Sequence, residues 1–146
     1  MKEATMSESE IRNIVCKTGK QLLKDSLAVR TWGNVSHRLD KEHMIITPSG
    51  KLYEELEAEY MVKVNLKTFK VVGKYKPSSE FKMHAGIYKH RKNISAIIHT
   101  HQVNASVLPS VLTHSLPPLA HSFIIKLDHS HLPFQKILRG RFGAIP

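Results

Sequence analysis

The chain has one cysteine and one tryptophan among its 146 residues, and it contains no long apolar run. The single cysteine, Cys16, cannot form an internal disulfide, which favours a reducing compartment. Its apolar neighbours Ile14 and Val15 indicate a small buried side chain rather than a reactive thiol. No segment approaches the roughly 20 apolar residues that span a bilayer, and the polar N-terminus lacks a signal-peptide core. We therefore expect a cytoplasmic protein that does not bind membranes.

Acidic residues are also scarce. Lysine and arginine number 22 against 12 aspartates and glutamates, which gives a formal net charge of +10. Such an excess favours anionic partners, including phosphorylated metabolites. The densest basic run, residues 89–92, is too short for a nucleic-acid arm, and no basic stripe interleaved with aromatics is present. This run is typical of a solvated helix end, so we expect no nucleic-acid partner.

The order of apolar and polar residues predicts a mixture of helices and hairpin-connected strands. Ser7 and Glu10 match a capping box that begins the first helix. Helices are expected at 7–27, 77–92 and 104–111, a short acidic helix or turn at 53–59, and strands after the turn at 31–36 and at 44–47, 61–65, 69–72, 94–101 and 123–127. This pattern favours an α/β or α+β sheet covered by helices. The segment 121–146 is basic and lacks sustained periodicity.

Two histidines, His99 and His101, close the apolar segment 94–101 with one residue between them. Alternate residues of a strand point to the same face, so both side chains could reach one ion. Imidazole suits Zn²⁺ and other divalent transition metals. A pair of histidines hydrogen-bonded at the edge of the core would give the same pattern, so both interpretations stay open at this point.

The segment Pro77-Ser78-Ser79-Glu80 precedes the second strong helix. Hydroxyls and backbone N–H groups at a helix N-terminus can bind an anion such as phosphate. Simple capping of the helix by Ser78 or Ser79 is the alternative, and on this segment alone it is favoured. Glu80 fits the first turn of a helix for dipole reasons, and it could equally serve as a general base if it were held near a metal.

Two further loops, Gly33-Asn34 and Ser49-Gly50, are small enough for backbone N–H groups to approach a phosphate closely. Each loop alone is an ordinary turn. The order of the four motifs along the chain is more specific than any one of them: a Gly-Asn pair, a Ser-Gly pair, a Ser-Ser-Glu triplet and a His-x-His pair.

With these motifs, the chain resembles the class II aldolase/adducin-head family. This family includes L-fuculose-phosphate aldolase and L-ribulose-phosphate 4-epimerase. The resemblance rests on "TWGNVS" (31–36), "ITPSGKLYEEL" (46–56), "KPSSEFKMHAGIYKHR" (76–91) and "AIIHTH" (96–101), and it covers roughly residues 7–120. It implies a three-layer α/β/α fold with a largely antiparallel central sheet. A family domain is therefore expected over residues 1–120, followed by an atypical tail at 121–146.

The resemblance also implies roles for individual residues. The implied phosphate-binding residues are Gly33, Asn34, Ser49, Gly50, Ser78 and Ser79. Glu80 is the implied catalytic acid/base, and His99 and His101 are the implied ligands of Zn²⁺ or another divalent transition metal. The implied activity is retro-aldol cleavage of a ketose phosphate to dihydroxyacetone phosphate and an aldehyde, in a homotetramer.

The chain departs from the family pattern near its end. Family members carry a third metal-binding histidine far downstream in a His-Gly segment, and no His-Gly dipeptide occurs here. We expect a C-terminally truncated or frame-shifted chain whose fold is incomplete. The alternative is a short variant in which His121, His129 or His131 replaces that ligand.

Other functions remain open on the same motifs. These are sugar-phosphate 4-epimerisation, dehydration, decarboxylation, and a non-catalytic interaction module like the adducin head. Retention of Glu80 together with the His-x-His pair argues against the non-catalytic module, because protein contacts do not require those residues.

Overall fold

The computed structural model describes residues 6–28, 31–100 and 123–128. It contains the α-helices α1 (Glu8–Lys24) and α2 (Phe81–His90), the short 3₁₀ helices η1 (Tyr53–Glu55) and η2 (Ala58–Tyr60), and the strands β1 (Asn34–Arg38), β2 (His43–Ile46), β3 (Val62–Asn65), β4 (Val71–Val72), β5 (Ile94–Thr100) and β6 (Phe123–Asp128). The helix expected at 104–111 lies outside the described residues. Within these residues, no helix has the length and apolarity that crossing a bilayer requires.

The first helix begins as its sequence predicts. The Ser7 hydroxyl accepts a hydrogen bond from the backbone N–H of Glu10 at 3.3 Å, and the Glu10 carboxylate accepts one from the N–H of Ser7 at 2.7 Å. These reciprocal bonds satisfy two donors that would otherwise lack a helical partner. The helix ends at Lys24, slightly earlier than expected, because Ser26 adopts a φ of 56° and turns the chain.

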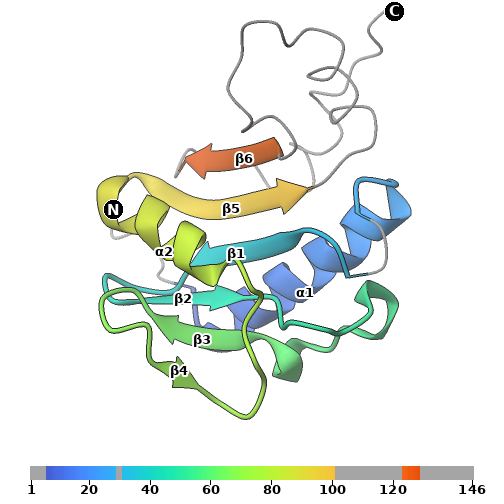
Figure 1. Cartoon of the computed structure of the whole chain (residues 1–146), viewed down its shortest axis with the longest axis horizontal. Helices are drawn as coiled ribbons and strands as arrows, with labels where there is room; N and C mark the ends of the chain where they lie inside the picture. The colour runs from blue at the N-terminus through green and yellow to red at the C-terminus, as the bar shows by residue number, and fades with distance from the viewer. Residues whose placement is uncertain (1–5, 29–30, 101–122, 129–146) are drawn as a thin grey trace, which may run out of the picture.

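The six strands form one sheet in the order β4-β3-β2-β1-β5-β6, and every neighbouring pair is antiparallel (Figure 1). The hairpin predicted over 61–72 is present as β3 and β4. Its second strand begins only at Val71, because Phe69 has a φ of 60° and still belongs to the turn. The acidic segment expected to form a short helix or turn at 53–59 forms the two 3₁₀ helices η1 and η2.

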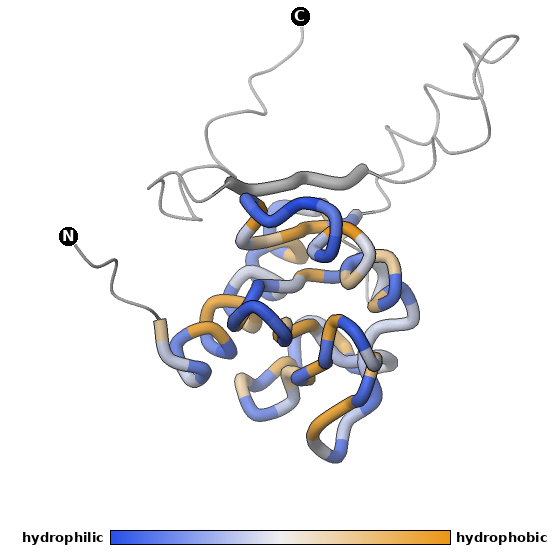
Figure 2. Tube along the Cα trace, turned by 90° about the vertical axis from the view of Figure 1, so that its left-hand side faces the viewer, coloured by the Kyte–Doolittle hydropathy of each residue, from blue (hydrophilic) through white to orange (hydrophobic). Residues whose placement is uncertain are grey.

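The helices lie on opposite faces of this sheet (Figure 1). Alternation along β2 shows the division: Ile45 belongs to the apolar cluster that contains the buried residues of α1, whereas Met44 and Ile46 belong to the cluster that contains those of α2. The same division separates Ile98 from Ile97 on β5. Figure 2 shows hydrophobic and hydrophilic residues in alternating short segments along the described trace. The three-layer, largely antiparallel fold expected from the sequence is confirmed.

The C-terminal end of α2 is held against the sheet by Arg38 of β1. Its guanidinium donates to the backbone carbonyls of Tyr88, Arg91 and Ile94 at 2.9–3.0 Å, and it lies 4.6 Å from the centre of the Tyr88 ring. A cation at a helix C-terminus also complements the helix dipole. This contact fixes the position of α2, and with it the residues that α2 presents to the sheet.

Candidate active site

The three loops with predicted phosphate-binding residues are joined by backbone hydrogen bonds. Thr47 N–H donates to the carbonyl of Val35 at 3.0 Å, and the carbonyl of Thr47 accepts from Ser78 N–H at 3.0 Å. The N–H of Ser49 donates to the carbonyl of Lys76 at 2.9 Å, beside an antiparallel bridge between the prolines that follow Thr47 and Lys76. These three loops are distant in the sequence, but their backbones are hydrogen-bonded to one another and lie side by side at the candidate site.

Gly33 occupies a position that requires glycine. Its φ is 91°, and a Cβ added there would lie 2.8 Å from the carbonyl oxygen of His99. The carbonyl of Gly33 accepts a hydrogen bond from the Tyr53 hydroxyl at 2.7 Å. Burial raises the pKa of Tyr53 to about 12, so the phenol keeps its proton and remains a donor. Gly33 is thus fixed between η1 and β5.

The other phosphate-binding candidates differ in exposure. Ser49 and Gly50 are exposed in a turn. Gly50 has a φ of 72°, and a Cβ added there would meet no atom within 4 Å. Ser78 is buried and Ser79 is exposed. Neither serine caps α2: the capping position is Glu80, and no side chain makes a capping hydrogen bond there. The capping interpretation of these serines is therefore wrong, because α2 begins after them, and the anion-binding interpretation stays a prediction.

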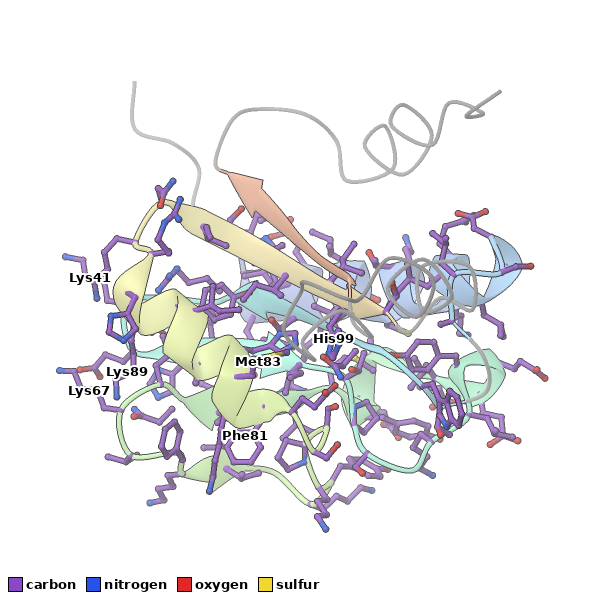
Figure 3. All side chains as sticks on the ribbon, turned by 45° about the horizontal axis from the view of Figure 1, so that its top comes forward. Lys41, Lys67, Phe81, Met83, Lys89 and His99 are labelled. Atoms are coloured by element: carbon purple, nitrogen blue, oxygen red, sulfur yellow. The ribbon has the colours of Figure 1, made fainter. Side chains whose placement is uncertain are left out.

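Glu80 lies where β1, β5 and α2 meet. Its Oε2 atom accepts a hydrogen bond from Nδ2 of Asn34 at 2.6 Å, and it lies 2.7 Å from Nδ1 of His99. Asn34 and His99 are register partners on the adjacent strands β1 and β5, so their side chains share the face that α2 covers. Figure 3 shows His99 in the interior beside the start of α2, where Phe81 and Met83 are labelled.

The contact between His99 and Glu80 is compatible with either a shared proton or a bound cation. A ring nitrogen and a carboxylate oxygen this close repel each other unless a proton or a cation lies beside them. The described residues contain no group of three or more histidine, cysteine, aspartate or glutamate side chains that could hold an ion, whereas catalytic zinc normally has three protein ligands. His101 lies outside the described residues. The zinc site at His99 and His101 therefore stays a prediction.

His84 belongs to this site although no sequence motif indicates it. It is fully buried on α2, its Nδ1 lies 2.7 Å from the Ser36 hydroxyl, and its Nε2 contacts Oδ1 of Asn34. Burial, with a smaller electrostatic contribution from the nearby His99, lowers the pKa of His84 to about 3. The sequence contains only an indirect signal: His84 follows Glu80, the N-cap residue of α2, by four residues, about one helical turn.

The chain matches a known protein family. The family described as "Class II Aldolase and Adducin N-terminal domain" matches residues 13–136, which is most of the chain. The chain therefore belongs to the class II aldolase/adducin family. Family membership was expected from the four motifs, and it is confirmed.

Several solved structures are similar to this chain. An L-fuculose 1-phosphate aldolase is 36% identical, with a TM-score of 0.66, and the alignment covers 74% of this chain and 51% of that one. YgbL of Klebsiella pneumoniae, described as an aldolase, epimerase or decarboxylase candidate, is 28% identical, with a TM-score of 0.68 and coverages of 77% and 53%. The L-fuculose-1-phosphate aldolase of Thermus thermophilus is 25% identical, with a TM-score of 0.61 and coverages of 73% and 53%. The chain spans about half the length of these relatives.

Proposed function

We propose that the chain carries the active site of a metal-dependent sugar-phosphate aldolase, which cleaves a ketose phosphate to dihydroxyacetone phosphate and an aldehyde. The observation that carries this proposal is the position of Glu80. One oxygen of its carboxylate meets both an amide donor from β1 and an imidazole from β5, at the edge where the predicted phosphate loops are joined.

Phosphate binding would use the hydroxyls and the remaining N–H groups of these loops. The backbone N–H groups of Ser49 and Ser78 already donate within the protein, so their side-chain hydroxyls would be the donors to phosphate. Gly33, Gly50 and Ser79 would add backbone N–H groups, and Asn34 would add its second amide hydrogen. The excess of 22 basic over 12 acidic residues would attract the anionic substrate from a distance.

The chemistry requires a proton donor close to the carbon that gains charge. When the bond between C3 and C4 of the ketose breaks, the electron pair stays on C3 and the C4 oxygen becomes the aldehyde oxygen. The proton of the C4 hydroxyl would pass to the Glu80 carboxylate. Glu80 would deliver a proton to C3 and recover it in the condensation direction. A divalent ion held by His99 and His101 would supply Lewis-acid stabilisation of the negative charge.

The proposal is tested with L-fuculose 1-phosphate and L-rhamnulose 1-phosphate, by measuring release of dihydroxyacetone phosphate by the full chain with and without added Zn²⁺. We expect turnover that a chelator abolishes, and Glu80→Gln should lower kcat about 10²- to 10⁴-fold. Glu54→Gln, at an exposed glutamate of η1, is the matched control and should retain full activity. Bound zinc is measured in the same samples, and absence of zinc after loading would remove the metal-site prediction.

A second reaction on the same site is favoured by the similarity to YgbL, which is described as an aldolase, epimerase or decarboxylase candidate. Product analysis separates these reactions. An epimerase returns a sugar phosphate with the same number of carbons, and a decarboxylase releases carbon dioxide. Either product in place of dihydroxyacetone phosphate would replace the aldolase proposal while keeping Glu80 as the residue that moves the proton.

The assembly into a homotetramer also remains a proposal. It is supported by membership of the class II aldolase/adducin family. Light scattering coupled to size-exclusion chromatography would give the mass directly. A monomer at micromolar concentration would exclude the tetramer for this chain.

A further inference from the structure

A continuous line of buried polar side chains runs from the interior of α2 to Glu80. The Tyr88 hydroxyl lies 2.9 Å from the Ser36 hydroxyl, which lies 2.7 Å from Nδ1 of His84. On the other side of the ring, Nε2 of His84 contacts Oδ1 of Asn34, and Nδ2 of Asn34 donates to Glu80 at 2.6 Å. Tyr88, Ser36, His84 and Asn34 are each at most 2% exposed.

The donor and acceptor at each step follow from the carboxylate at the end. An ionised carboxylate only accepts hydrogen bonds, so Asn34 must turn its NH₂ group toward Glu80 and its carbonyl toward His84. Nε2 of His84 must then carry a hydrogen. A neutral ring has its lone pair on the other nitrogen, so Nδ1 accepts from the Ser36 hydroxyl, which in turn accepts from Tyr88. With a neutral ring, only this arrangement of hydrogens satisfies all four contacts.

The amide of Asn34 has two orientations of nearly identical shape. Rotating it by half a turn would place its carbonyl oxygen against the Glu80 carboxylate, where two acceptors repel each other. Nε2–H of His84 prevents this rotation, because it would then face an NH₂ group and lose its acceptor. Glu80 is the N-cap residue of α2 and His84 lies four residues later in its first turn, so Asn34 bridges the side chain of the cap residue and a side chain of the helix.

We propose that His84, as the neutral tautomer protonated on Nε2, is a positioning residue that holds the Asn34 amide with its N–H toward Glu80. This inference rests on the proposed function, in which Glu80 is the group that moves the proton. It also refines the role of Asn34, whose amide orients the carboxylate as well as offering its second hydrogen to phosphate. Misplacement of a reacting group by about 1 Å can cost on the order of 100-fold in rate.

Two substitutions distinguish positioning from space filling. His84→Phe keeps an aromatic ring but removes both ring nitrogens. His84→Gln loses the ring but can present an NH₂ group to Asn34 and a carbonyl to Ser36, in the same order as the histidine. If His84 only fills space, phenylalanine is the better replacement. If it positions Asn34 by hydrogen bonding, glutamine is better, and we expect this order.

The first measurement does not depend on activity. Nitrogen-15 NMR of the ring nitrogens in the full chain should show one protonated nitrogen, Nε2, and one nitrogen with a lone pair, Nδ1, in His84 at neutral pH. The carboxamide protons of Asn34 should exchange slowly, and they should exchange at least 10-fold faster in His84→Phe. His90→Gln, at an exposed position of the same helix, is the control and should leave them unchanged. A ring protonated on Nδ1 instead would overturn the proposal.

The second measurement uses turnover. We expect His84→Phe to lower kcat about 10- to 100-fold with less than a 3-fold change in KM, and His84→Gln to recover most of the loss. A rise in KM at constant kcat would mean that Asn34 is held for substrate binding alone, which overturns the proposal. A loss that merely tracks the folded fraction in thermal unfolding would overturn it as well. If the wild-type chain has no turnover, the proposed function fails, and the NMR result alone decides whether His84 positions Asn34.

Discussion

Replacing Gly33 by alanine tests the backbone contact that joins the first phosphate loop to the strand of His99. An L-residue at positive φ costs about 1–2 kcal/mol, and replacing glycine returns about 0.4–1 kcal/mol by restricting the unfolded chain. At Gly33 the new Cβ would also meet the carbonyl oxygen of His99 at 2.8 Å, and such overpacking adds about 1–3 kcal/mol. The expected loss of unfolding free energy is therefore about 3 kcal/mol, within a range of about 1–5 kcal/mol.

Gly50→Ala is the matched control. Gly50 also has a positive φ, 72°, but nothing lies within 4 Å of an added Cβ, so its loss should stay near about 0.5–1 kcal/mol. Urea unfolding followed by far-UV circular dichroism measures both losses. Fluorescence of the single tryptophan, Trp32, reports on the loop beside Gly33 in the same titration. Equal losses for the two variants would refute the claim that Gly33 is required by its contact with His99.

Three further outcomes follow from other contacts. Tyr53→Phe leaves the partly buried carbonyl of Gly33 without this donor and should lower the unfolding free energy by about 1–2 kcal/mol in urea titrations. Ser7→Ala removes the capping box of α1 and should lower it by about 1 kcal/mol, whereas Ser9→Ala should change it little. His84 has a folded-state pKa of about 3 against an ordinary value of 6.5, so its contribution to stability is present above pH 6.5. That contribution falls by up to about 1.4 kcal/mol per pH unit as pH decreases toward 3, and His84→Gln should flatten the curve in urea unfolding at stepped pH.

The local features of the fold could be predicted from the sequence because each depends on neighbouring residues. The capping box at Ser7 and the alternation through β3 are examples, since their hydrogen bonds and faces repeat within a few residues. The boundaries were less accurate, because Ser26 and Phe69 adopt positive φ values that ordinary side chains rarely take. Serine and phenylalanine do not by themselves predict a positive φ.

The candidate site was predicted only in part. Glu80, Asn34 and His99 were predicted from motifs. The structure places Asn34 and His99 within 2.7 Å of one carboxylate oxygen of Glu80. His84 and Tyr53 were missed because their roles depend on partners far along the chain, Ser36 and Gly33 respectively. Such contacts follow from how β1, η1 and α2 pack together, which a pattern of residues in one element does not contain.

The pairing of Asn34 with His99 across β1 and β5 has a practical consequence for finding the natural ligand. The two residues are widely separated along the chain, so the site exists only when the centre of the sheet is intact. A compound that binds there stabilises the folded state by mass action, by about 2.7 kcal/mol at roughly 100 times its dissociation constant. A shift in melting temperature across a panel of sugar phosphates would therefore rank candidate substrates without any assay of their chemistry.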